Sequence, residues 1–196
     1  ITNFNSHYKF YPSMFSIWMR LLKLIPNSVF WFLEGSISSR KNLINEAEKR
    51  GVNKDKLIFA KSLPHDEHLS RLKLADLSLD NQYHGGGVTS TDTLWAGVPL
   101  ITLSGDSPPS RNGATILTAL ETPELITYTL REYEEKALFY ANNPSELDKM
   151  KQKILSKKHI APLFNNKILA KNLEKSFIEM WNIYSKHKQP KHIIIK

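Results

Sequence analysis

The sequence predicts an α/β fold, a Rossmann-like parallel sheet with helices on both faces and a helical C-terminal end. Three observations predict it. Short, continuous apolar runs typical of buried strands alternate with longer segments of helical periodicity. Parallel strands need crossover connections, which helices between the runs supply. A glycine-rich stretch also joins one apolar run to the next helix, at the place where open sheets bind ligands.

Breaking and capping residues delimit the first elements. Apolar residues recur at helical spacing after Pro12, and Pro26 ends that helix. Ser38 or Ser39 can cap the second helix, which Gly51 ends as a left-handed stop. The expected elements are a helix over residues 12–24, a strand over 28–33, a helix from 38 to 51 and a strand over 57–60.

The alternation continues and then gives way to helices. After residue 103, only the run at 124–126 hints at a further strand. There is no internal repeat and no low-complexity linker, so a single domain is expected over residues 1–196. The remaining expected elements are a helix over about 64–74, a strand over 77–79, a helix over 89–96, a strand over 99–103, and helices over 110–120, 131–141, 144–159 and 166–184.

Composition narrows the class of protein. The absence of cysteine excludes disulfides and thiolate metal sites and is compatible with a reducing compartment. No apolar run approaches the roughly 20 residues that a bilayer requires. The first residue is Ile1 rather than a methionine, so we expect the chain to be a piece of a larger protein.

The formal net charge of +8 raises the question of nucleic acid. Much of the excess lies on lysines of the C-terminal helices, a pattern typical of a solvated face. No nucleic-acid motif and no aromatic residues spaced for stacking accompany these lysines. The sequence therefore predicts neither a nucleic-acid partner nor a membrane partner.

Segment 80–92 links the end of a strand to the start of a helix and contains Gly85, Gly86 and Gly87. Glycines remove side chains that would block a phosphate, and free N–H groups at the helix start attract an anion. A plain tight turn is the alternative interpretation. Neither G-x-G-x-x-G nor G-x-x-x-x-G-K-[ST] occurs, which disfavours dinucleotide oxidoreductases and P-loop NTPases and favours a sugar-nucleotide site.

Three polar residues flank this loop. Asp92 lies about one turn beyond Thr89, where its oxygens can accept from ribose hydroxyls or stabilise the first turn of the helix. His68 comes early in the helix after the 57–60 strand, where it can stack on a base or remain a lone surface histidine. Lys9 follows the first strand, where a lysine can meet a diphosphate as a point charge.

A zinc site is considered because His65 and His68 lie on either side of Asp66 and Glu67. The H-E-x-x-H order is missing, and so is an obvious third ligand. We therefore expect no metal site.

Several motifs together closely resemble the C-terminal catalytic lobe of protein O-GlcNAc transferases, nearly from end to end. The resemblance implies the second Rossmann-like lobe of a GT-B fold, with residues 166–196 as a closing helix and tail. It also implies that the N-terminal lobe and the tetratricopeptide helical repeats lie outside this chain. The motifs are Phe4-Asn5 with Tyr8-Lys9, Pro26-Asn27-Ser28-Val29, Glu67-His68, Ala75-Asp76 with Leu79-Asp80, Asp92 to Pro99, Pro162 to Asn165, and Met180-Trp181 with Tyr184.

The resemblance also implies a chemistry: metal-independent, cofactor-free, inverting transfer of N-acetylglucosamine from UDP-GlcNAc to serine or threonine hydroxyls of proteins in the cytoplasm, the nucleus or both. Lys9 would be the catalytic residue that stabilises the departing UDP, with uracil at Leu63 and His68 and ribose at Asp92. The implied donor-binding residues are Ser6, Lys9, Leu63, His65, His68, Gly86, Gly87, Val88, Thr89 and Asp92.

Four positions depart from the family pattern. Relatives usually carry His-Thr-Thr where this chain has Gly87-Val88-Thr89, and a glutamine where it has Ser6. His65 replaces a common lysine, so a fixed charge becomes a titratable one. Backbone contacts survive these changes, whereas side-chain contacts to phosphate and sugar are put in question.

Two other functions stay open. A protein O-fucosyltransferase lobe that uses GDP-fucose would share the fold and the loop, although the run from Asp92 to Trp95 favours the O-GlcNAc branch. A non-catalytic interaction module with a degenerate site is the second. In either enzyme the isolated chain is expected to be inactive, because two lobes build the cleft.

Overall fold

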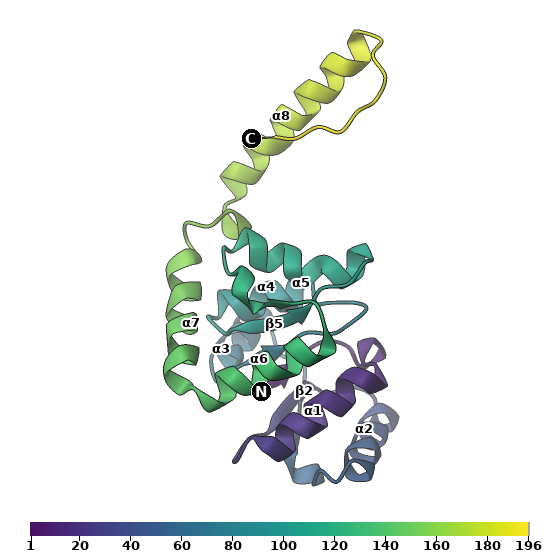
Figure 1. Ribbon diagram of the computed structural model, residues 1–196, viewed down its shortest axis with the longest axis vertical. Helices are drawn as coiled ribbons and strands as arrows, with labels where there is room; N and C mark the ends of the chain where they lie inside the picture. Colours follow the sequence, from purple (N-terminus) through teal and green to yellow (C-terminus); the bar gives the residue numbers. More distant parts are fainter. Residues whose placement is uncertain (196) are drawn as a thin grey trace.

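The computed structural model describes residues 1–195, and its centre is one six-stranded sheet in the order β3-β2-β1-β4-β5-β6 (Figure 1). Every pairing between neighbouring strands is parallel. This confirms the predicted Rossmann-like α/β fold. The strands are β1 (Thr2–Asn3), β2 (Phe30–Leu33), β3 (Leu57–Ala60), β4 (Ser78–Leu79), β5 (Leu100–Leu103) and β6 (Ile126–Thr127).

Helices cover both faces of the sheet. The chain crosses the sheet in one direction from β1 to β3 and in the opposite direction from β3 to β6. Because such crossovers are right-handed, the helices between β1 and β3 lie on one face of the sheet and the helices between β3 and β6 lie on the other. The packing of α1 on α6, and of α3 and α5 on α4, agrees with this division. The helices are α1 (Pro12–Leu24), α2 (Ile37–Lys49), α3 (His65–Leu72), α4 (Val88–Trp95), α5 (Pro108–Ala119), α6 (Leu130–Asn142), α7 (Pro144–Lys157) and α8 (Asn166–Ser185).

Short 3-10 turns account for two of the differences from the sequence predictions. The first strand ends at Asn3, and Lys9 lies in a turn, η1 (His7–Lys9), before α1. Turn η3 (Pro123–Leu125) fills most of the expected 124–126 strand, because Pro123 fixes its own φ and starts the turn, so β6 begins at Ile126. Two further turns are η2 (Lys54–Lys56) and η4 (Pro162–Phe164).

The predicted cap of the second helix was wrong by two residues. Ser36 is the N-cap, and its Oγ accepts from the N–H of Ser39 at 3.1 Å. A serine must precede the first helical residue by one position for its hydroxyl to reach that N–H, and Ser39 already lies inside the first turn. The expected stop is confirmed, since Gly51 has a φ of +73° just beyond the helix.

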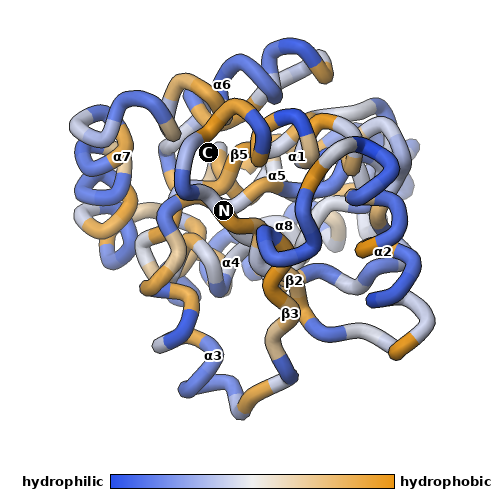
Figure 2. Tube along the Cα trace, turned by 90° about the horizontal axis from the view of Figure 1, so that it is seen from below, coloured by the Kyte–Doolittle hydropathy of each residue, from blue (hydrophilic) through white to orange (hydrophobic). Residues whose placement is uncertain are grey.

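The core lies between the sheet and the α1/α6 layer. Phe30 and Phe32 point to the same face of β2, two residues apart, and their rings stack at 4.4 Å. Trp18 of α1 packs on Phe30 at 5.0 Å, and its indole N–H donates to Tyr133 of α6. Hydrophobic residues accordingly mark β2, β3 and β5 in Figure 2. This core holds the strand ends of the site in place.

Helix α8 departs from the body of the molecule (Figure 1). Of its 20 residues only Ile183 is buried. None of the helices in residues 1–195 is long and apolar enough to cross a membrane. The large apolar side chains of α8, which recur about once per turn, are exposed: Ile168, Leu169, Leu173, Phe177, Ile178, Met180, Trp181 and Tyr184.

Candidate functional site

The site lies at the carboxyl ends of the strands, where the strand order reverses between β1 and β4. Such a switch point leaves a crevice between the loops that follow the two strands. Here those loops carry Lys9 after β1 and residues 80–87 after β4. The predicted phosphate-binding segments, distant in the sequence, therefore meet at one edge of the sheet.

A pocket of about 220 Å³ opens beside this crevice, between β2, α3 and α4. It is smaller than the ~300–1,000 Å³ typical of complete small-molecule sites. This size fits one part of a nucleotide. The pocket gathers five of the predicted residues, Leu63, His65, His68, Thr89 and Asp92, and adds Phe4, Leu33, Ser62 and Arg71.

Two of these predicted residues are already bonded to each other. The Nε2 atom of His65 lies 3.1 Å from Oδ2 of Asp92. The imidazole is largely exposed, whereas the carboxylate is mostly covered. His65 thus orients a carboxylate that begins the second turn of α4, and its other ring nitrogen stays available.

Arg71, which the sequence analysis missed, fixes the protonation of His68. The guanidinium donates from Nη2 to Nδ1 of His68 at 2.6 Å and from Nη1 to the carbonyl of Lys61 at 2.7 Å. Arginine has only donors, so Nδ1 of His68 must accept and Nε2 must carry the proton. Burial, and then the charge of Arg71, lower the pKa of His68. The pocket therefore presents a neutral imidazole with one N–H donor.

The surroundings of Arg71 explain how a charge is held there. Its guanidinium carbon lies 4.7 Å from the centre of the Phe4 ring and 5.9 Å from that of Trp31. Arg71 follows His68 by three residues on α3, on the same helical face. That spacing was the one signal in the sequence that could have identified it.

A shared acceptor joins the predicted lysine to the glycine loop. Oδ1 of Asn5 accepts from Nζ of Lys9 at 3.3 Å and from Oγ1 of Thr89 at 3.0 Å. Asn5 is itself buried and held by Oδ1 of Asn3, whose Nδ2 donates to Asn81 on the β4 loop. A ladder of asparagines therefore ties the two loops of the crevice together, and the sequence analysis did not assign it.

The glycine loop has the geometry of an anion cradle. A Cβ on Gly86 would come within 2.2 Å of Ser90 Oγ, whereas one on Gly87 would meet nothing within 4 Å. Within the described part of the chain, no partner is recorded for the N–H groups of Gly87, Val88 and Thr89. These groups start α4, where an anion is favoured. Glycine is thus required at 86, while 87 borders open space.

Two predicted residues take less part. The Val88 side chain is 72% exposed, so this residue offers its backbone N–H alone. Ser6 lines a separate hollow with His7, Gly35 and Ser39. His7 closes that hollow, with its ring nitrogens 2.5 Å from Ser39 Oγ and 2.7 Å from the Leu33 carbonyl. Ser6 therefore lines this neighbouring hollow and not the pocket that contains His68 and Asp92.

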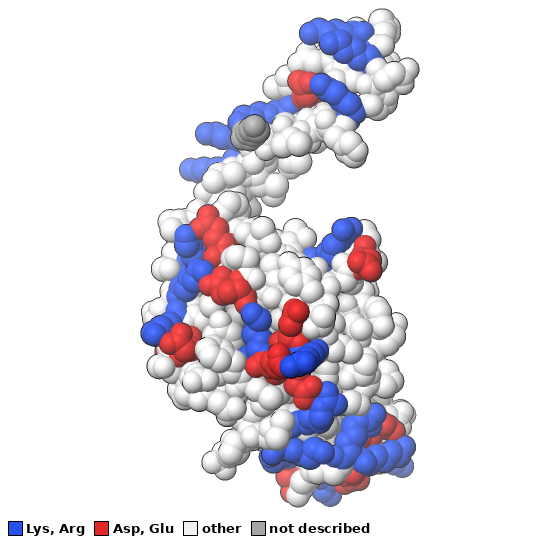
Figure 3. All heavy atoms as spheres, viewed as in Figure 1, with Lys and Arg blue, Asp and Glu red and all other residues white. Residues whose placement is uncertain are grey.

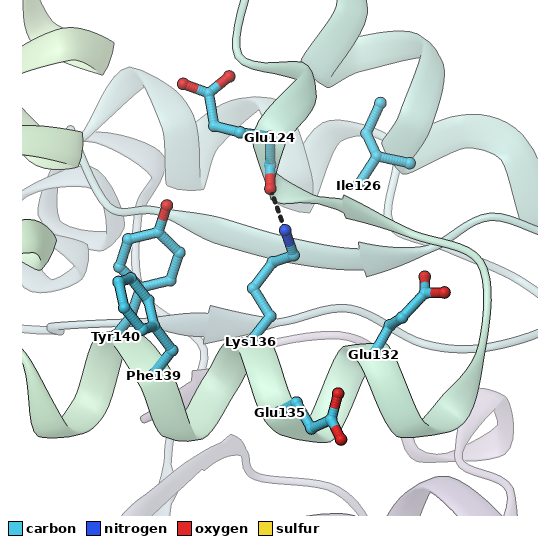
Figure 4. Close-up of a pocket in the computed structure, with 7 residues that line it drawn as sticks. All are labelled: Glu124, Ile126, Glu132, Glu135, Lys136, Phe139 and Tyr140. Carbon is cyan, nitrogen blue, oxygen red and sulfur yellow. Dashed lines mark hydrogen bonds between the residues drawn. The ribbon is translucent and has the colours of Figure 1, made fainter.

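A larger hollow lies elsewhere, between β6 and α6 (Figure 4). Glu124, Glu132 and Glu135 surround it, and its one lysine, Lys136, is bonded to the Glu124 carbonyl. Acidic side chains gather over α6 in Figure 3. Glu124 and Glu135 are paired with Lys153 and Arg131, and Lys136 is already bonded, so the lining of this hollow offers no free cation to a phosphate. The smaller pocket, beside the free N–H groups of α4, is therefore the better candidate for a nucleotide. Across residues 1–195, no group of three histidine, aspartate or glutamate side chains is placed to hold a metal ion.

A parallel sheet with a base-sized pocket and an anion cradle at its switch point defines a nucleotide-binding Rossmann-like domain. The chain belongs to glycosyl transferase family 41, whose family model matches residues 1–173.

Relatives and solved structures extend this result. A protein of Arabidopsis thaliana, named "Probable UDP-N-acetylglucosamine--peptide N-acetylglucosaminyltransferase SEC", is 35% identical over 96% of this chain and 19% of its own length. The UDP-N-acetylglucosamine--peptide N-acetylglucosaminyltransferase of Caenorhabditis elegans is 30% identical over 97% of this chain and 17% of its own length. A mutant O-GlcNAc transferase of Thermobaculum terrenum aligns with a TM-score of 0.84 at 23% identity, over 92% of this chain and 35% of that one. The chain thus spans about a fifth of these curated relatives, and the solved structure confirms the fold.

Proposed function

We propose that this chain is the donor-binding lobe of a glycosyltransferase that moves N-acetylglucosamine from UDP-GlcNAc to serine or threonine hydroxyls of proteins. The observation that carries the proposal is the convergence of Lys9 and the three free N–H groups of α4 next to the base-sized pocket. The names of the two relatives support UDP-GlcNAc as the donor and a peptide as the acceptor.

Each part of the site would take one part of the donor. Uracil enters the pocket, where Nε2–H of His68 donates to a ring carbonyl and the Leu63 backbone meets the opposite edge. Asp92, oriented by His65, accepts from the ribose hydroxyls. The diphosphate lies against the first N–H groups of α4, beside Lys9.

We propose transfer with inversion, as the family resemblance implies, with the acceptor oxygen on the face of the sugar opposite the diphosphate. The acceptor oxygen attacks the anomeric carbon as the bond from that carbon to the β-phosphate oxygen breaks, so negative charge grows on the diphosphate. Lys9 and the N–H donors face that charge, and such donors commonly contribute several kcal/mol. A protonated Lys9 has no lone pair, so the hydroxyl proton leaves to another base. We propose that no metal ion takes part.

Calorimetry on the full-length protein tests the donor. We expect UDP-GlcNAc to bind more tightly than GDP-fucose, because the names of both relatives give UDP-N-acetylglucosamine as the donor. Tighter binding of GDP-fucose would make the protein a fucosyltransferase. No thermal stabilisation by millimolar UDP would instead indicate a non-catalytic module.

The remainder of the polypeptide would supply the second lobe of the cleft. We propose that the exposed apolar side chains of α8 pack against that lobe, since contiguous exposed apolar surface of this kind marks an interface. Hydrogen exchange tests this: the α8 amides should be protected in the full-length protein and open in residues 1–196 alone. The isolated chain should also be inactive, and measurable transfer by it would contradict the two-lobe proposal.

A further inference from the structure

Asp80 follows β4 directly and lies beneath the glycine loop, entirely buried. Its backbone carbonyl accepts from the hydroxyl of Tyr133 at 2.8 Å, and Tyr133 in turn accepts from Trp18. This chain of bonds runs through the core from α1 to the strand end. The position of Asp80 is therefore fixed from the α1/α6 side of the sheet.

The carboxylate of Asp80 is satisfied by three donors. Oδ1 accepts from the N–H groups of Asn81 and Gly86, both at 2.8 Å, and Oδ2 accepts from the Thr102 hydroxyl at 2.9 Å. Backbone N–H groups can only donate, so Oδ1 is an acceptor in the resting protein. Burial raises the pKa of Asp80, and the bonds from Gly86, Asn81 and Thr102 oppose that effect by favouring the charged form.

The bond to Gly86 closes residues 80–86 into a ring. The Gly86 N–H directly precedes the three free N–H groups at the start of α4. The bond therefore keeps the carboxylate on the buried side of the loop and leaves the free N–H groups on the open side. Two glycines make room for it: a Cβ would lie 3.0 Å from Oδ2 on Gly85 and 2.5 Å from it on Gly113.

We propose that Asp80 is a positioning residue of the donor site, which holds the glycine loop in its anion-binding form through its bond to Gly86. This inference rests on the proposed function. Burial lowers the pKa of Lys9, and the charge of Asp80 opposes that effect. Asn5, the group to which Lys9 is bonded, is neutral. Asp80 thus acts on the diphosphate through Gly86 and Lys9 without touching it.

The first test is Asp80→Asn in the full-length protein. Asparagine keeps the acceptor for Asn81 and Gly86 and removes the charge. We expect UDP to bind about tenfold more weakly, a loss of ~1.4 kcal/mol. The alkaline limb of the kcat/KM profile should also move to lower pH, because the pKa of Lys9 falls and the ammonium is lost earlier as pH rises. A Lys9→Arg background should abolish that movement, since arginine stays charged.

Two matched variants separate this role from support of the fold. Thr102→Val removes the donor to Oδ2 but keeps the charge and both loop bonds, so it should lower Tm and leave the alkaline limb in place. Gly113→Ala brings a Cβ to 2.2 Å from Thr102 Oγ1 and 2.5 Å from Asp80 Oδ2, so it crowds the bonded pair without changing the charge of Asp80. Compared with Thr102→Val, it should also weaken UDP binding, and it should leave the limb in place. If Asp80→Asn does not fold, Gly113→Ala with unchanged UDP affinity overturns the proposal.

The outcomes also distinguish the two proposals. Failure of the unaltered protein to bind UDP overturns the proposed function. Binding of UDP by the unaltered protein, with the same affinity and the same pH profile in Asp80→Asn, overturns the role of Asp80 alone.

Discussion

The two halves of the site are built differently. The cradle rests on buried groups: the ladder of Asn3, Asn5 and Asn81, and the bond from Gly86 to Asp80. The base pocket rests on side-chain pairs nearer to solvent, with His65 on Asp92 and Arg71 on His68. The contrast is one of degree, because Asn81 Nδ2 in the ladder has no hydrogen-bond partner among the described residues and Arg71 is itself buried. The His65 imidazole is largely exposed, and exposed pairs are weak and adjustable, whereas buried networks hold one geometry. We therefore expect changes in the cradle to affect catalysis and changes in the pocket to tune affinity.

Loss of the cradle's cation should have the largest effect. In full-length Lys9→Met we expect kcat to fall by about 10²–10³-fold with a small change in KM, because the charge develops on the diphosphate mainly in the transition state. Steady-state kinetics measure this. Lys61→Met, which removes an exposed lysine after β3, is the control. A loss of less than tenfold in Lys9→Met would remove Lys9 from the chemistry.

The two glycines of the loop should separate folding from binding. Gly86→Ala forces a Cβ against Ser90 and Thr89, so Tm should fall by several degrees and UDP binding should weaken about tenfold or more. Gly87→Ala should lower Tm less, because the space around residue 87 is open and only the poorer N-cap of alanine counts against it. Thermal melts measure Tm, and calorimetry measures the affinity for UDP. Equal losses of Tm in both variants would show that the loop is not held as described.

Arg71→Met should move the pH dependence of the pocket. Neutral His68 accepts from Arg71 at Nδ1 and carries its one N–H at Nε2, and the charge of Arg71 helps to lower its pKa. Without Arg71 the pKa of His68 rises, so the imidazole becomes protonated at a higher pH. UDP binding should therefore weaken several-fold, and on acidification it should be lost at a higher pH than in the unaltered protein. NMR titration of His68 and calorimetry measure both effects. Arg40→Met is the matched control, since its guanidinium also lies over a ring, that of Phe59, away from the pocket. An unmoved His68 titration would disprove the pairing.

A smaller effect is expected at His65. His65→Lys places a permanent charge beside Asp92 and should strengthen UDP binding by about two- to fivefold, the range of exposed ion pairs. Ser70→Lys adds the same charge to α3 outside the pocket lining and should change nothing. Calorimetry at low and high salt measures this, because the gain should shrink as salt screens the charges. Equal gains in both variants would indicate a general charge effect.

No effect at all is expected from chelation. We predict that EDTA leaves the transferase activity of the full-length protein unchanged, because Lys9 and the N–H donors occupy the role that a cation would otherwise fill. Dialysis against EDTA followed by an activity assay checks this. Recovery of lost activity by added Mn²⁺ or Mg²⁺ would contradict it.

The sequence predicted the order of elements well because periodicity is local. Residues 57–60, 12–24 and 166–184 lie in the elements that were expected, within a residue. The same local patterns placed the pocket residues His68 and Asp92 near one ligand. They could not identify Asn5 or Arg71, whose roles depend on partners that folding brings close. Choosing Ser38 or Ser39 over Ser36 as a cap failed for a similar reason, because three nearby serines look alike until the first turn is fixed.

Asn5 has a consequence for how a ligand enters. Its one side-chain oxygen already takes a bond from Lys9 and another from Thr89. An arriving diphosphate therefore exchanges partners with Asn5 rather than finding loose donors, and each new bond replaces an old one. The two donors are therefore already held in one place, on one oxygen, before any ligand arrives.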